Sequence, residues 1–471
     1  MESHRVRPEG TLSSTPESFR LSTLDHTVTE NYMNWAIIFK LEDADDYVEA
    51  ITQGFKRALG VTLGQCRHYV GKIEVNEHGD FSIVKKADST VRFDVRRLDG
   101  PLFSELEAAK FSAASLGDHA LFTIEGMTMS CGTYPHHIGH DVSAFQLTFV
   151  PGGMVFTIHQ HHLLGDVFAA SSFARQLAGN CSSVFKGTEP PSWDDALIDR
   201  ARFITPPPSA FDDKTPLAPV PQKHPDWQPC SWLLFHIQED KLVALKKLAS
   251  PDDGTWISTY DAVMALIWRV LTKNRAPIYK HEPSSPAIFM EAVNMRSRLN
   301  PPVPEGYQGN LFCPGISFYQ PDQLTTADVI SDAPLSRLAG FVRKVTQSVT
   351  SHMLDGMLQS AAAMPNKFTL HGRADSVPPI SLVVTDWRTA PFCTHDFGIG
   401  RPIVERLLCD TVIENGVVLY PPRVTDEEGN PDPSPGLEVL IPFETQAVDS
   451  LINDEEMKAF FEFRSIEATG P

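Results

Sequence analysis

Apolar residues recur at two different spacings along the chain, and the change between them predicts a mixed α/β fold. From Asp43 to Leu59 they return every third or fourth residue, which is the period of an amphipathic helix. From Phe145 to Ile158 they alternate with other residues on both sides of Pro151-Gly152-Gly153, which predicts a β-hairpin. We therefore expect sheets with flanking helices rather than a helical bundle.

The second half of the chain repeats this mixture. The apolar run Trp232 to Ile237 predicts a strand, and the segment from Asp240 to Leu248 predicts a short helix. A longer helix begins after Ser258, whose side chain can cap it together with Asp261, three residues later.

Two signals near the C-terminus predict a turn and a helix start. Asn415-Gly416 lies between two apolar stretches, the second being Val417 to Tyr420, as in a two-residue hairpin. Asn453 precedes the acidic residues Asp454 to Glu456, so we expect Asn453 to cap the last helix.

A proline-rich stretch near the middle divides the chain. Regular patterns fade between residues 189 and 229, where proline is concentrated, as in a linker between domains. A length of 471 residues allows two or three domains. We predict an N-terminal domain over residues 1–188, a crossover linker over 189–229 and a C-terminal domain over 230–471.

Composition and charge exclude several classes of protein. Hydrophobic residues make up 42% and charged residues 21% of the chain, as in ordinary globular proteins. The formal net charge of −19 repels phosphate backbones, so we expect no nucleic-acid partner, although a local basic pocket could still bind an anionic small molecule. No window of 18 apolar residues and no apolar leader are present, which predicts a cytoplasmic protein with no membrane partner.

The seven cysteines are scattered and include no C-x-x-C pair. This predicts free buried thiols in a reducing compartment. Nothing in the sequence indicates a coiled coil or another assembly element, so we expect a monomer.

Three histidines and a carboxylate follow one another at the end of the predicted hairpin. The period of a strand places His159 and His161 on one face and His162 on the other, if the strand extends that far. A histidine at this position can act as a general base near neutral pH or can be a structural residue. Asp166, four residues after His162, can orient its imidazole or can cap the next helix and pair with a cation.

Metal ligation is the weaker interpretation of the histidines. No third ligand follows His159 and His161 at a recognised spacing. A second group, His136, His137 and His140, lies with Asp141 in a predicted loop. We expect no metal site.

Several common catalytic motifs are missing, and two other segments are unusual for plain surface. The sequence contains no G-x-S-x-G, G-x-x-x-x-G-K-[ST], G-x-G-x-x-G or H-E-x-x-H motif, which argues against the corresponding hydrolases, nucleotide-binding proteins and zincins. The segments Val293–Pro302 and Asp396–Pro402 could each be a simple loop.

Taken together and in order, these segments resemble the BAHD superfamily of acyl-CoA-dependent acyltransferases. His161–Val167 resembles its H-H-x-x-x-D-G motif, and Asp396–Gly400 resembles D-F-G-W-G. The segment Asn294–Pro304, followed by Gly309-Asn310, is similar to the family's R-x-R-L-x-P-P-L-P and G-N block, and Leu21–Asp25 resembles its opening. The likeness spans nearly the whole chain, and the details look most like fungal secondary-metabolite O-acetyltransferases of the trichothecene type, which act in mycotoxin biosynthesis.

The resemblance implies a fold and a mechanism. The fold would be two chloramphenicol-acetyltransferase-like α/β domains, joined by a long crossover and separated by a tunnel. His162 would deprotonate an acceptor hydroxyl or amine, which attacks the acyl-CoA thioester directly in a ternary complex, and would then reprotonate the leaving thiolate. Asp166 would be turned away from His162 and salt-bridged to Arg296. The motif residues Asp396, Phe397, Gly398 and Gly400 would support the fold and the CoA channel.

The donor would be a co-substrate, with acetyl-CoA as the first candidate, and no cofactor would be bound permanently. Ser258 and Thr259 could bind a phosphate at a helix start. Further candidates are cations, for each of which solvated surface is the alternative: Lys273, Arg275, Arg298 and Lys344.

Two departures from the family pattern concern the acceptor and the oxyanion. Val167 replaces a glycine whose suggested role is to leave room for substrate, which predicts an altered acceptor pocket. Ile399 replaces the tryptophan, so backbone N–H groups would have to stabilise the oxyanion.

The favoured function is O-acylation of a hydroxylated small secondary metabolite, and three alternatives stay open. The first is N-acylation. The second is a condensation-type enzyme that takes its acyl group from a carrier protein, against which Asp396–Gly400 argues. The third is a catalytically silent binding protein of the same fold, against which the intact His162, Asp166 and Arg296 argue.

Overall fold

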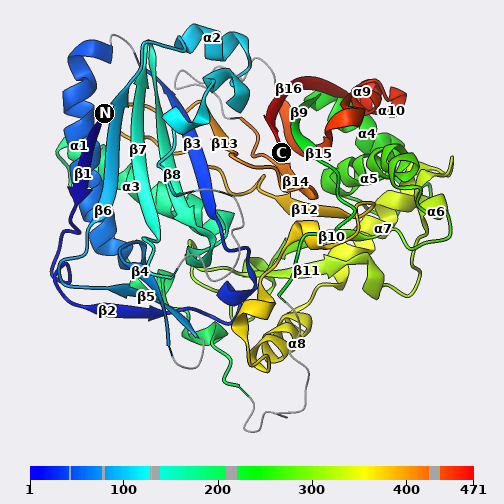
Figure 1. Cartoon of the computed structure of the whole chain (residues 1–471), viewed down its shortest axis with the longest axis horizontal. Helices are drawn as coiled ribbons and strands as arrows, with labels where there is room; N and C mark the ends of the chain where they lie inside the picture. The colour runs from blue at the N-terminus through cyan, green and yellow to red at the C-terminus, as the bar shows by residue number, and fades with distance from the viewer. Residues whose placement is uncertain are drawn as a thin grey trace.

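Two large β-sheets lie next to each other along the long axis of the molecule (Figure 1). The computed structural model describes residues 1–41, 44–76, 80–127, 129, 138–207, 220–423 and 435–470. The sheets combine parallel and antiparallel pairs and carry helices, so the predicted mixed α/β class is confirmed.

The first sheet contains six strands among the described residues, and all neighbours except β6 and β7 run antiparallel. Its central hairpin, β7 and β8, is the one predicted from alternation, and it pairs Phe145 with Ile158 across the turn at Pro151-Gly152. Gly152 has a φ of +79°, which favours glycine at this turn. In order across the sheet the strands are β1 (Glu2–Val6), β6 (Val91–Arg97), β7 (Ser143–Val150), β8 (Gly153–His161), β3 (Tyr32–Lys40) and β13 (Val404–Leu407).

The strand β13 reaches this sheet from the C-terminal half of the chain. It pairs antiparallel with β3, with Val404 opposite Ile38 and Leu407 opposite Trp35. The first sheet is thus completed by residues far beyond position 188, while the domain boundaries at 188 and 229 remain predictions.

The second sheet contains seven described strands, and its strand β9 is buried on both faces. Leu233, Phe235 and Ile237 pack into the core beneath the helices of the C-terminal half. Trp232 and Leu234 alternate with them and join the larger core shared with the first sheet. In order the strands are β11 (Phe312–Ile316), β10 (Phe289–Asn294), β12 (Leu382–Asp386), β14 (Gly416–Leu419), β15 (Gly436–Glu444), β9 (Cys230–Gln238) and β16 (Phe461–Thr469).

A small third sheet lies at one end of the first, at the bottom of Figure 1. Its strands are β2 (Glu17–Arg20), β5 (Phe81–Lys85) and β4 (Lys72–Val75).

The helices agree with the periodicity predictions, apart from one cap. The helix predicted from Asp43 is α1, although Asp43 itself lies outside the described residues. Ser258 caps α5 in a capping box with Asp261, as predicted. Asn453 does not cap α10; the cap is Asp454, whose carboxylate accepts from the next turn and offers a charge that suits the helix dipole better than an amide. The described helices are α1 (Ala44–Gln65), α2 (Phe103–Ala108), α3 (Val167–Lys186), α4 (Glu239–Leu248), α5 (Thr259–Tyr279), α6 (Thr326–Ile330), α7 (Leu335–Ser348), α8 (Ser351–Ala362), α9 (Val448–Ile452) and α10 (Glu455–Phe460).

The hairpin predicted at Asn415-Gly416 is wrong. Gly416 begins β14, which pairs with β12 and β15, whereas the preceding strand β13 belongs to the other sheet. Asn415 is fully buried in the passage between the sheets. A local turn signal could not show that its two flanks lie in different sheets.

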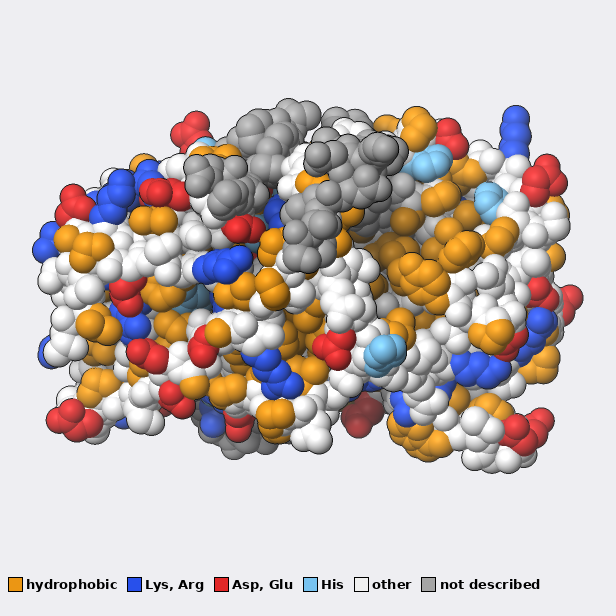
Figure 2. Space-filling view, turned by 90° about the horizontal axis from the view of Figure 1, so that it is seen from below, with side chains coloured by type: hydrophobic (Ala, Val, Ile, Leu, Met, Phe, Trp, Pro, Cys, Tyr) orange, Lys and Arg blue, Asp and Glu red, His pale blue; other side chains and the backbone are white. Residues whose placement is uncertain are grey.

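Within the described part of the chain, no helix is both long and apolar enough to cross a membrane. On the face shown in Figure 2, basic and acidic side chains are interspersed, so the net charge of −19 does not gather there as one acidic field.

Candidate active site

A cavity of about 380 Å³ is lined by residues of both large sheets. Met33 and Trp35 of β3 line it from the first sheet, and Thr385 of β12 and Val418 of β14 from the second. His162 is part of the same lining. The cavity is mostly apolar, so it suits a small organic ligand.

His162 does not continue the strand that precedes it. β8 ends at His161, and residues His162–Leu164 form one turn of 3-10 helix, which we call the His162 turn. The strand alternation predicted for the histidines therefore stops at His161. His159, on the strand, is buried and its Nδ1 atom lies 2.7 Å from the side-chain oxygen of Asn34, as expected of a structural histidine.

The environment of His162 favours a neutral imidazole. Burial lowers the pKa of His162 below its ordinary value of 6.5, and the carboxylates of Asp166 and Asp25 oppose this effect. Among the described residues the Nδ1 atom is buried without a hydrogen-bond partner, which leaves Nε2 as the ring nitrogen available to a ligand. A neutral, half-buried imidazole at a cavity wall can accept a proton from a bound hydroxyl.

Asp166 faces Arg296 rather than His162. Its two oxygens accept from both terminal nitrogens of Arg296, each at 2.9 Å. They also accept from the backbone of Leu311 at 2.9 Å and from that of Ala169 at 3.0 Å, where Asp166 caps α3. The carboxylate is therefore occupied by an ion pair and a helix cap.

Arg296 connects this ion pair to a neighbouring loop. Its guanidinium group also donates to the backbone oxygens of Gly309 at 2.8 Å and Tyr307 at 3.2 Å. It lies over the ring of Phe168, with the Cζ atom 5.2 Å from the ring centroid. Sequence reasoning brings His162, Asp166 and Arg296 to one place, and the structure does the same.

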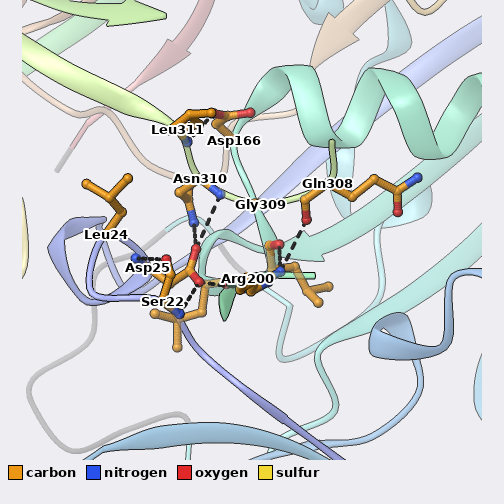
Figure 3. A network of polar contacts seen from close by, with 12 residues as sticks. Ser22, Leu24, Asp25, Asp166, Arg200, Gln308, Gly309, Asn310 and Leu311 are labelled. Carbon is orange, nitrogen blue, oxygen red and sulfur yellow. Dashed lines mark hydrogen bonds and ion pairs between the residues drawn. The ribbon is translucent and has the colours of Figure 1, made fainter. Parts of the chain in front are cut away.

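Three further residues meet at the His162 turn, and sequence reasoning did not assign them a role. Asp25, Arg200 and Asn310 point toward one another from three separate segments (Figure 3). Asp25 and Asn310 stand inside motifs that mark the family resemblance, which was a usable signal. Arg200 lies in the predicted linker, where no spacing or motif distinguishes it.

The glycine-rich segment at Asp396 is a compact loop tied to α3. One Asp396 oxygen accepts from the backbone of Gly398 at 2.7 Å and Gly400 at 3.3 Å, and the other from Lys186 at 2.7 Å. Phe397 is buried between phenylalanines of β3 and α1. No residue of this segment is part of the cavity lining among the described residues, and its role at a CoA channel remains a prediction.

The residues predicted to bind CoA are spread over the C-terminal half and do not line the cavity. Ser258 and Thr259 are at the start of α5. Lys273 pairs with Asp454 and Lys344 with Asp322, each at 2.7 Å, and both lysines are partly exposed. A phosphate could reach them at the surface, and their role in binding it remains a prediction.

The two arginines of that prediction are held by the protein itself. Arg275 is 1% exposed and pairs with Glu444 at 3.0 Å, so a phosphate could reach it only by breaking a buried ion pair. Arg298 donates to the backbone oxygens of Thr346 and Val349, and burial lowers its pKa. The buried pair with Glu444 therefore occupies Arg275 in this structure.

The two departures from the family motifs lie in different surroundings. Val167 lines the cavity as the first residue of α3, beside His162. Ile399 packs against the large core instead.

The second histidine group is only partly described. His136 and His137 lie outside the described residues, and Asp141 forms ion pairs with Arg5 at 3.6 Å and Lys72 at 3.7 Å. The described residues contain no group of three His, Cys, Asp or Glu side chains that could hold a metal ion.

The chain is similar to known proteins over most of its length. The model of a family described as the Transferase family matches residues 1–431. The chain is 39% identical over 461 residues to Acetyltransferase FGR3 of Gibberella zeae, an alignment that covers 96% of this chain and 91% of the relative.

Solved structures show the same two-domain fold. TRI101 of F. graminearum, complexed with coenzyme A and deoxynivalenol, matches with a TM-score of 0.76 and 18% identity, over 95% of this chain and 100% of that one. TRI101 of F. sporotrichioides, complexed with coenzyme A and T-2, matches with a TM-score of 0.74 and 19% identity, over the same shares of the two chains. The predicted pair of α/β domains is confirmed at the level of the fold.

Proposed function

This chain belongs to the Transferase family, the BAHD acyltransferases, and on that premise we propose that it moves an acyl group from coenzyme A to a hydroxyl group. The acceptor is a small secondary metabolite bound in the central cavity, and acetyl is the first candidate for the acyl group. The observation that carries the proposal is the position of the His162 imidazole at the wall of a cavity lined by both sheets, where burial lowers its pKa.

The similar proteins support both substrates. The relative at 39% identity is an acetyltransferase by name. The TRI101 structures hold coenzyme A together with deoxynivalenol or T-2 mycotoxin, which supports a CoA-linked donor and a small secondary metabolite as the acceptor for this chain.

In the proposed mechanism His162 accepts one proton from the acceptor substrate and later donates it to the leaving thiolate. Its Nε2 atom takes the proton of the acceptor hydroxyl while the oxygen attacks the thioester carbonyl. The tetrahedral intermediate then collapses, the carbon–sulfur bond breaks, and His162 returns the proton to the thiolate. Because Ile399 has no N–H group in its side chain, backbone N–H groups stabilise the oxyanion in this mechanism.

Other residues support this chemistry without taking part in it. Asp166 and Arg296 hold the start of α3 beside His162. Asp396, Phe397, Gly398 and Gly400 stabilise the fold near the channel, and Ser258, Thr259, Lys273 and Arg298 are the candidates for contacts with the nucleotide end of the donor.

The proposal also includes a monomer in the cytoplasm. The six described cysteines are free and buried, which supports a reducing compartment.

Calorimetric titration with acetyl-CoA and longer acyl-CoA thioesters tests the proposal, followed by measurement of CoA release with a panel of hydroxylated and amine acceptors. We expect His162→Ala to bind the donor as the native protein does, but to lose at least about 10³-fold in kcat. His352→Ala is the matched control, because His352 is exposed on α8.

Two results would contradict the proposal. Absence of donor binding at millimolar acyl-CoA would exclude a CoA-dependent reaction and favour a carrier-protein donor. Undiminished transfer by His162→Ala would exclude His162 as the base.

A further inference from the structure

The backbone carbonyl groups of the His162 turn receive hydrogen bonds from outside their own segment. Arg200 donates to the oxygen of Leu163 at 3.2 Å and also to that of Leu164. The side-chain amide of Asn310 donates to the oxygen of His162 at 3.0 Å. Leu163 and Leu164 are buried. Their carbonyl oxygens therefore accept hydrogen bonds from a side chain, whereas at an exposed helix end such oxygens accept them from water.

Arg200 comes from the segment predicted as a linker, yet its side chain is 3% exposed. It pairs with Asp25, which is fully buried, at 2.6 Å, and it donates to the backbone oxygen of Gln308 at 3.2 Å. One guanidinium group thus donates to one carboxylate and three backbone oxygens. These four acceptors lie on three segments of the chain, around Asp25, in the His162 turn and at Gln308. A planar fork of five donors can do this, whereas the point charge of a lysine cannot.

Asp25 closes the network into a ring. One of its oxygens accepts from Arg200 and, at 2.7 Å, from the backbone of Ser22. The other accepts from the side-chain amide of Asn310 at 2.8 Å, the same amide that holds the oxygen of His162. Figure 3 shows Asp25, Arg200 and Asn310 meeting at this point.

Two ion pairs therefore lie at the His162 turn: Arg200, paired with Asp25, holds the carbonyl groups of Leu163 and Leu164, and a second pair follows the turn. Asp166, two residues after the turn, is held by Arg296, and the backbone of Leu311 donates to Asp166 at 2.9 Å. Asn310, which precedes Leu311, donates to Asp25 and so belongs to the hydrogen-bond network of Asp25 and Arg200. The four residues Gln308–Leu311 contact both systems, as Figure 3 shows.

We propose that Arg200, paired with Asp25, is a positioning residue for the transfer reaction. It fixes the carbonyl groups of the His162 turn and, through them, the direction of the imidazole. This inference rests on the proposed role of His162 as the base. A base must lie within hydrogen-bond reach of the proton it accepts, and a displacement of about 1 Å can cost about 100-fold in rate.

The test compares Arg200→Lys with the native protein by two measurements. Titration with acetyl-CoA gives the fraction of molecules that bind the donor, so that kcat can be expressed per binding site. We expect the donor Kd to stay within about twofold and kcat per site to fall about 100-fold. We also expect guanidinium ion, but not urea, to restore part of the kcat of Arg200→Ala, because only the cation can pair with Asp25.

Arg406→Lys is the matched control. Arg406 is also buried, pairs with Glu438 at 2.9 Å and donates to the backbone oxygen of Phe111, and among the described residues its hydrogen bonds do not reach the His162 turn. We expect this variant to lose stability while keeping its kcat per site. If Arg200→Lys does not fold, Asn310→Ala replaces it in the test. This variant removes only the amide hydrogen bonds to the backbone oxygen of His162 and to the carboxylate of Asp25, and we expect kcat per site to fall about 10-fold.

The outcomes separate this inference from the proposed function. Equal losses of kcat per site in Arg200→Lys and Arg406→Lys would reduce Arg200 to a structural residue and overturn the inference. Native kcat per site in Arg200→Lys, or in Asn310→Ala if that variant replaces it, would overturn it too. Undiminished transfer by His162→Ala would instead refute the proposed base, whatever Arg200 does.

Discussion

At the residue scale, the proposed chemistry depends on an imidazole whose surroundings oppose its protonation. Burial lowers the pKa of His162 below 6.5, so the base is neutral at pH 7 and becomes protonated only in more acidic solution. We expect kcat/KM to be flat from pH 7 to 8 and to fall with acid, with a midpoint below 6.5. Initial rates at subsaturating acceptor across this range give the profile.

Stability must be followed over the same pH range, because other buried histidines also titrate. Burial lowers the pKa of His26 to about 4 and that of His159 to about 3. Below pH 6.5 the unfolded chain therefore binds protons that the folded chain does not, and acid lowers the free energy of unfolding. A midpoint above 7 for kcat/KM, in protein that is still folded, would contradict a neutral His162 in the native state.

The family resemblance brought His162, Asp166 and Arg296 together, because each stands in one of the motifs that carry the resemblance. It could not find Arg200 in the same way. Arg200 meets Asp25 across 175 positions of sequence separation, inside a segment whose composition indicates only a linker. The contact depends on the path that the segment around Arg200 takes in the folded chain, and no local sequence pattern predicts that path.

At the element scale, Asp166 joins the cap of α3 to the ion pair with Arg296. We expect Asp166→Asn to lower the free energy of unfolding by about 3 kcal/mol, because it leaves the partly buried charge of Arg296 without its partner. Denaturant titration measures the change.

Asp194→Asn provides the comparison for a plain cap. Asp194 is exposed and accepts from the backbone of Ala196 at a short helical turn. Asparagine is as good a cap as aspartate, so we expect a change within about 0.5 kcal/mol. Equal effects in the two variants would show that the Arg296 pair adds nothing to the cap.

Elements with a strong period were predictable, and short elements defined by distant partners were not. The hairpin of β7 and β8 and the helix α5 follow from alternation and from a capping box. β13 has only four residues, and its place beside β3 is set by pairing with a strand more than 360 positions earlier. For this reason Asn415-Gly416 suggested a local hairpin where the chain passes from one sheet to the other.

At the scale of the whole molecule, the two halves of the chain are interlocked. β13 completes the first sheet from the C-terminal half, and Arg296 and Asn310 reach back to Asp166 and Asp25. A strand edge without its partner exposes unpaired backbone groups and promotes aggregation. Buried carboxylates without their partners are unstable as well.

We therefore expect that neither half forms a stable monomer alone, because a division at residue 230 leaves β13, a strand of the first sheet, on the C-terminal half. Residues 1–229 would lack the partner of β3, the Asn310 side chain that donates to His162 and the Arg296 side chain that pairs with Asp166, and residues 230–471 would expose β13. Size-exclusion chromatography and thermal unfolding of the separate and the co-expressed fragments test this. Co-expression should restore one cooperative unit with acyl-CoA binding, because the cavity is lined by both halves. A monomeric fragment 1–229 with a cooperative transition of its own would show instead that β13 is dispensable, and that the first sheet is an independent domain.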